Sequence, residues 1–156
     1  MFIQNLKRTL PVLLLVVLVA CQSSKVPADK KANASADNKP STSKGLTFEQ
    51  ATTIYFDFNQ YSVKETEVEK LEAQATWLLS NKTAKVTVEG HTDYLGTREY
   101  NIALGEKRAS ATKNYLVKKG VDAKNIKVVS YGKDKPVDSA DTDEARSKNR
   151  RTVSIK

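Results

Sequence analysis

The sequence predicts an α/β fold, an α+β sandwich in which helices pack on one mixed sheet. Short β-branched and aromatic segments alternate with long amphipathic ones, in the order β-α-β-α-β-β. The length of 156 residues is enough for one domain with attachments. With 39% hydrophobic and 28% charged residues, the chain is too polar for several membrane spans and too apolar for disorder throughout.

Strands are expected where β-branched and aromatic residues gather. These segments are residues 52–58, 85–89, 126–131 and 151–155. The polar connection 134–147 is expected to contain only a short helical turn, at residues 142–147.

Two long helices are expected, at residues 63–80 and 97–119. Ser62, three residues before Glu65, resembles a capping box for the first helix, and Gly120 follows the end of the second. One apolar face of the first helix is formed by Val68, Leu71, Ala75, Leu78 and Leu79.

Residues 1–20 predict an export signal. Lys7 and Arg8 precede an apolar run, residues 10–20, which is shorter than the roughly twenty residues that span a bilayer. The signal is expected to be absent from the mature protein.

The tetrapeptide LVAC at residues 18–21 resembles the bacterial lipobox. Cys21 is the only cysteine, and it lies where lipidation requires one. We expect lipid chains on Cys21 to anchor the protein, and Gln22 after it is typical of an outer-membrane destination. An ordinary signal peptide with an unpaired thiol, or an N-terminal anchor, is the alternative.

The next segment, residues 21–44, is expected to be a disordered tether behind the lipidated cysteine. It has no aromatic residue, and Val26 is its only large aliphatic one, so it cannot bury enough apolar area to offset its ordering entropy. A basic arm for nucleic acid is the alternative, but the lysines are spaced out and nothing can stack on bases.

The formal net charge of +8 does not indicate nucleic acid. Lys7 and Arg8 leave with the signal, and the tether holds five Lys against two Asp. Residues 45–156 then carry 19 basic and 16 acidic residues. No nucleic-acid partner, no cofactor and no metal are expected, since one Cys and one His cannot form a convincing zinc site.

Polar side chains gather after the second expected strand and along the second long helix. At about 100° per residue, Asn101, Leu104 and Arg108 form a stripe beside the core face. Asp93 lies in the glycine-containing loop before that helix. A carboxylate and a guanidinium together suit a small zwitterion, although Asp93 could instead form a turn and Arg108 could be an ordinary surface residue.

Three separated segments resemble one known family. They are residues 86–121, 130–136 (SYGKDKP) and 147–155 (SKNRRTVSI). They look like the OmpA-like peptidoglycan-binding domain, in the lipoprotein branch of that family. The resemblance implies an OmpA C-terminal-like domain over residues 45–156 that binds the diaminopimelate of the peptidoglycan stem and so tethers outer membrane to cell wall. It also implies contact with TolB and other Tol proteins.

The resemblance implies particular binding residues. Asp93 and Arg108 match the pair that holds the ammonium and carboxylate of diaminopimelate. The groove positions match Thr92, Asn101, Leu104, Phe58 and Asn59. Asn59 is neutral where some members carry Asp, so its amide can accept hydrogen bonds but contributes no charge.

Arg150 and Arg151 match the Asn-Arg-Arg motif of the family. Alternation along a strand sends their side chains to opposite faces, and the sequence leaves open which of them supports the groove. His91 is expected to pack or to form hydrogen bonds rather than to catalyse.

Other functions remain to be distinguished. A peptidoglycan hydrolase could use Glu89 and Asp93 as paired carboxylates, but no nucleophile or base arrangement accompanies them, so no enzyme is expected. A stator-like OmpA domain would need a membrane span, which the lipobox argues against. An adaptor role, in contact with a periplasmic protein, is compatible with wall binding.

Overall fold

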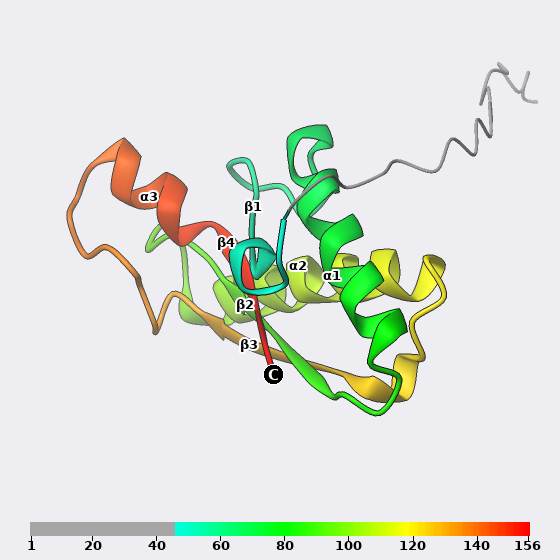
Figure 1. Cartoon of the computed structure of the whole chain (residues 1–156). Coiled ribbons are helices and arrows are strands. Elements are labelled where there is room, and N and C mark those ends of the chain that lie inside the picture. Colours follow the sequence, from blue (N-terminus) through cyan, green and yellow to red (C-terminus); the bar gives the residue numbers. More distant parts are fainter. Residues whose placement is uncertain (1–45) are drawn as a thin grey trace, which may run out of the picture. The chain divides into compact units, whose positions relative to one another are not determined.

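The computed structural model describes residues 46–156 (Figure 1). The predicted signal at 1–20, the lipidation site Cys21 and the tether at 21–44 lie outside the described residues. Among the helices that the structure describes, none combines the length and apolar character of a membrane span.

The described chain alternates strands and helices as the sequence predicts. In chain order the elements are η1 (Glu49–Ala51), β1 (Thr53–Tyr55), η2 (Glu65–Glu67), α1 (Val68–Ser80), β2 (Val86–His91), α2 (Arg98–Lys118), η3 (Ala123–Asn125), β3 (Ile126–Gly132), α3 (Asp143–Asn149) and β4 (Arg151–Ile155).

The four strands form one mixed sheet in the order β1-β4-β2-β3. β4 is antiparallel to both neighbours, whereas β2 and β3 are parallel and are connected through α2. Helices α1 and α2 contact each other and the sheet (Figure 1). The predicted α+β sandwich with a mixed sheet is confirmed.

The core lies between the sheet and these two helices. Strand residues Ile54, Val88 and Ile126 meet helix residues Leu71 and Leu116 there. Alternate strand positions therefore face the helices, as a half-covered sheet requires.

The first predicted strand, residues 52–58, is wrong at its end, because β1 stops at Tyr55. Phe56 N–H still donates to Arg150 O at 2.9 Å, but the chain then turns, with Gln60 N–H donating to Asp57 O at 3.1 Å. Asn59 in this turn is the one non-glycine residue of the described chain with a positive φ, 57°. The turn becomes one wall of the site described below.

The first predicted helix is wrong at its start. Residues 65–67 form the 3₁₀ turn η2, and neither N-cap residue, Lys64 or Glu67, accepts a side-chain cap hydrogen bond. The Ser62 capping box is therefore wrong, because Ser62 lies outside the helix. Leu79 is also 40% exposed, because it points about 100° away from the buried Leu78.

The second helix is close to its prediction. The Thr97 side chain caps α2 by accepting a hydrogen bond from Tyr100 N–H at 3.2 Å. Gly120 beyond its end has φ 101°, a conformation that glycine adopts without steric cost. The cap fixes the start of α2 directly beside the loop that carries Asp93.

The predicted turn at 142–147 is a full helix, α3, with Thr142 as its N-cap. Asn149 at its end donates to Asp138 O at 2.6 Å and accepts from Val137 N–H at 2.8 Å. This amide holds the preceding loop against the start of β4.

Candidate functional site

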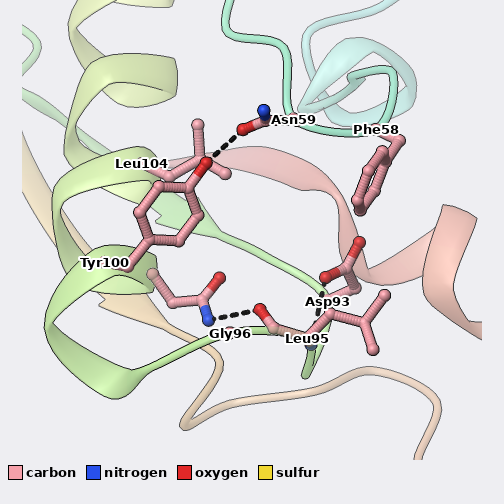
Figure 2. Close-up of a pocket in the computed structure, with 8 residues that line it drawn as sticks. Phe58, Asn59, Asp93, Leu95, Gly96, Tyr100 and Leu104 are labelled. Carbon is pink, nitrogen blue, oxygen red and sulfur yellow. Dashed lines mark hydrogen bonds between the residues drawn. The ribbon is translucent and has the colours of Figure 1, made fainter.

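A small pocket opens where β2 ends and α2 begins. Its walls are the turn at 57–60, the loop at 93–96 and the first turns of α2, and its volume is about 170 Å³. Figure 2 shows Phe58 and Asp93 on one side, with Tyr100 and Leu104 on the other. The lining residues are Phe58, Asn59, Asp93, Leu95, Gly96, Tyr100, Asn101 and Leu104.

Asp93 has the only carboxylate among these lining residues, and it is 5% exposed. One carboxylate oxygen, Oδ1, accepts from Leu95 N–H at 3.2 Å. The other, Oδ2, lies 3.3 Å from Arg150 Nη1. A carboxylate has about four lone-pair sites, so both oxygens keep the capacity to accept from a ligand.

Asn101 presents a second acceptor. Its Nδ2 donates to Leu95 O at 2.8 Å and to Thr97 O at 2.9 Å, which fixes the orientation of the amide. Its Oδ1 is buried and has no hydrogen-bond partner within residues 46–156. An unsatisfied buried oxygen costs about 1–3 kcal/mol, and a ligand N–H would remove that cost.

The mouth of the pocket is crossed by a side-chain hydrogen bond. Tyr100 Oη donates to Asn59 Oδ1, joining α2 to the turn at 57–60 (Figure 2). Phe58 beside it is 61% exposed. Asn59 therefore acts as a neutral acceptor that is already bound to Tyr100, and the pocket keeps a single carboxylate.

Arg108 is not one of the lining residues, and it is fully buried. Its guanidinium donates to Gln60 O at 2.8 Å, His91 O at 3.0 Å and Asp57 O at 3.1 Å. Burial lowers the pKa of Arg108 to about 10, against the opposite effect of Asp93. The guanidinium stays charged at neutral pH and holds the turn at 57–60 against the end of β2.

The two arginines of the Asn-Arg-Arg motif have different neighbours. Arg150 donates to Phe56 O at 3.3 Å and contacts Asp93. Arg151 donates to Asn149 O and Lys135 O, both at 3.5 Å. Of the pair, Arg150 is the one that the structure brings to Asp93.

His91 is buried, and neither ring nitrogen has a hydrogen-bond partner in the described chain. The ring stacks on Tyr131 with centroids 5.7 Å apart, and Nε2 lies 3.6 Å from Glu89 Oε2. Burial, with Arg151 and Lys135 nearby, lowers the pKa of His91 to about 4. The side chain packs, as expected.

The structure brings most of the predicted residues together. Five line the pocket: Asp93, Asn101, Leu104, Phe58 and Asn59. Thr92 lies on the far side of the same loop, in a second pocket. No group of three or more His, Cys, Asp or Glu within residues 46–156 could hold a metal ion.

Tyr100, Leu95 and Gly96 also line the pocket, and the sequence analysis missed them. A signal for Tyr100 was present, because it lies four residues before Leu104 and so shares its side of the helix. Leu95 and Gly96 carried no such signal, since loop residues follow no periodicity.

The β1-β4-β2-β3 sheet carries a small pocket at the end of β2, and the fold is that of an OmpA-like domain. The model of the OmpA family matches residues 55–150, and the chain belongs to this family.

Its relatives include named lipoproteins. The chain is 44% identical over 136 residues to the peptidoglycan-associated lipoprotein of Haemophilus influenzae, covering 87% of this chain and 88% of that one. The crystal structure of the peptidoglycan-associated lipoprotein from Burkholderia pseudomallei matches with TM-score 0.66 and 38% identity, over 67% of this chain and 88% of that one.

The fold is shared more widely. The C-terminal domain of Helicobacter pylori MotB matches with TM-score 0.62 and 23% identity, over 66% of this chain and 81% of that one. At that identity the likeness concerns the fold alone.

Proposed function

We propose that this protein is a noncatalytic, lipid-anchored outer-membrane protein that binds peptidoglycan and tethers the membrane to the wall. Membership of the OmpA family and the similarity to peptidoglycan-associated lipoproteins support it. The lipobox at Cys21 supports the anchor.

The ligand group in this proposal is the diaminopimelate of the peptide stem, bound noncovalently. The observation that carries it is the pairing, in one small pocket, of the Asp93 carboxylate with the unsatisfied Asn101 Oδ1. An ammonium has three N–H donors and no acceptor, so it fits two acceptors that no protein donor saturates. Phe58, Leu95 and Leu104 offer apolar contact to the carbon chain.

The ligand carboxylate needs a guanidinium, and two are near Asp93. Arg108 is the family's match, but it is fully buried and already has three carbonyl partners. The charge of Arg108 interacts with that of Asp93, and Arg150 is the more exposed of the two arginines. In this proposal Arg108 also positions both walls, so its loss would affect binding and stability together.

Calorimetric titration with stem tetrapeptides tests the ligand assignment. One peptide contains meso-diaminopimelate, and the other contains lysine, which keeps the ammonium but lacks the second carboxylate. We expect the diaminopimelate peptide to bind about tenfold or more tightly, because a charged hydrogen bond contributes about 1.5–3 kcal/mol. Equal affinities would refute the zwitterion assignment.

A hydrolase is the second candidate, and the positions of its two carboxylates argue against it. Glu89 lies beside His91 and is not part of the pocket that Asp93 lines. We expect purified protein to release no soluble muropeptides from sacculi. Measurable turnover would overturn the noncatalytic assignment.

The resemblance extends the proposal to TolB as a protein partner. Capture of purified TolB on the immobilised protein is the expected result. Absence of capture at micromolar concentrations would remove this partner without affecting wall binding.

A further inference from the structure

The loop at 92–96 separates the pocket described above from a second one. Asp93 and Leu95 line the first pocket, whereas Thr92 and Tyr94 line the second. Successive residues therefore face alternate sides of one thin wall. The second pocket is larger, about 280 Å³ against about 170 Å³.

The acids that line the second pocket already have cationic partners. Asp138 pairs with Lys148 at 2.9 Å, and Asp141 pairs with Arg146 at 2.8 Å. Asp141 also accepts from Tyr94 Oη. These two carboxylates are therefore neutralised by the protein itself and leave little negative charge for a cationic ligand.

Lys133 also lines the second pocket, and its contacts are with backbone carbonyls rather than with charged groups. Its Nζ donates to Gly96 O at 2.6 Å and to Tyr94 O at 3.3 Å. No ion pair among residues 46–156 includes it. An ammonium has three donors, so one N–H remains after the two carbonyls. Lys133 is thus a fixed, uncompensated positive charge on the wall between the two pockets.

We propose that the second pocket receives the part of the peptide stem next to the residue held in the first, and that Lys133 binds a carboxylate there. This inference rests on the proposed function. In a stem peptide the residue before diaminopimelate is a γ-linked glutamate, whose α-carboxylate remains ionised. The Lys133 ammonium, held beside the first pocket, can donate a hydrogen bond to that carboxylate. The Tyr94 ring offers an aromatic face to the peptide chain.

A purely structural role for Lys133 makes a different prediction. If Lys133 only holds the loop through its two carbonyl contacts, its loss would lower the affinity for every ligand of the first pocket equally. If it binds a carboxylate, its loss would matter only for ligands that carry one. Discrimination between an acid and its amide therefore separates the two roles.

The test uses the purified full-length chain in detergent and two soluble tetrapeptides, measured by calorimetry. Both peptides contain diaminopimelate, and they differ only in whether the glutamate α-carboxylate is free or amidated. We expect the wild type to prefer the free acid by about tenfold, as for loss of one charged hydrogen bond. In Lys133→Met the preference falls to near unity, while Lys135→Met, which removes a neighbouring charge held over Tyr131, keeps it.

Each result has a definite meaning. Equal affinity of the wild type for acid and amide overturns the Lys133 assignment, and so does a preference that survives in Lys133→Met. If the wild type binds neither peptide, the diaminopimelate site itself is wrong, and the inference falls with it.

Discussion

The guanidinium of Arg108 joins two segments that lie far apart in the sequence, the turn at 57–60 and the end of β2. Its three acceptors are backbone carbonyls. The sequence placed Arg108 on a stripe beside the core, but periodicity could not show that a distant turn would cover it completely. The resemblance implies that Arg108 holds the ligand carboxylate, whereas the structure gives its guanidinium three backbone acceptors.

Arg108→Met should destabilise the domain by about 3 kcal/mol or more, because a fully buried guanidinium is lost and its three backbone carbonyl acceptors lose their charged donor. Urea denaturation monitored by circular dichroism measures the change. The control is Arg98→Met, whose partner Asp134 lies on the surface at 2.7 Å and whose loss should cost less than about 1 kcal/mol. Similar midpoints for the two variants would show that Arg108 does not hold the walls.

His91 should make stability fall in acid. Its pKa is lowered to about 4 in the folded state, from an ordinary value of 6.5. Above pH 6.5 both states are neutral, and between these values the unfolded chain binds the extra proton. Stability should therefore decrease as the pH falls from 6.5 to 4, by roughly 3 kcal/mol at most.

The measurement is the urea midpoint of the wild type and of His91→Phe at pH 7 and pH 4.5. Phe keeps the stack on Tyr131 and cannot titrate, so the carboxylates, which titrate in both proteins, cancel in the comparison. An equal acid-induced loss in both proteins would exclude His91 as the cause.

At the scale of elements, the backbones of α2 and β2 lie in direct contact at Gly105 and Gly90. A Cβ on Gly90 would lie 1.9 Å from Gly105 O, so neither backbone leaves room for a side chain. This contact sets α2, with Asn101 and Leu104, against the strand that leads to Asp93. Both residues can be read as glycine in the sequence, but nothing there indicates that Gly90 and Gly105 lie in contact, because they belong to different elements.

Gly90→Ala should destabilise the domain by about 2 kcal/mol or more through overpacking, and should weaken binding because the two walls move apart. Thermal melting and peptide titration measure these effects. Ala103→Ser, on the exposed side of α2, serves as the control and should change stability by less than about 0.5 kcal/mol. A stable Gly90→Ala variant would contradict the close packing.

Local signals predicted some elements well and others badly. The cap at Thr97 and the glycine at 120 bound α2, so its limits were readable from neighbouring residues. β1 ends at Tyr55, and the next hydrogen bond joins Phe56 N–H to Arg150 O, 94 positions away along the chain. Contacts of this range leave no trace in local periodicity, and for the same reason Leu95 and Gly96 were missed as pocket residues.

At the scale of the whole molecule, we expect membrane attachment to depend on Cys21 and peptide binding to depend on the folded domain, so that each can be removed without the other. Cys21→Ser should abolish lipid labelling and release the protein from membranes, because two or more acyl chains provide the stable attachment. Fractionation of cells grown with labelled palmitate measures both effects. Unchanged membrane retention would refute the lipidation of Cys21, while peptide binding by the released protein should stay the same.

Cosedimentation with two kinds of sacculi tests the central claim, recognition of diaminopimelate by the Asp93 pocket. We predict that the protein pellets with sacculi whose stems contain diaminopimelate and remains largely in solution with sacculi whose stems contain lysine. Asp93→Asn, shown to be folded by its circular dichroism spectrum, should remain in solution with both. Equal pelleting of the wild type with the two wall types, or wild-type pelleting by folded Asp93→Asn, would contradict the claim.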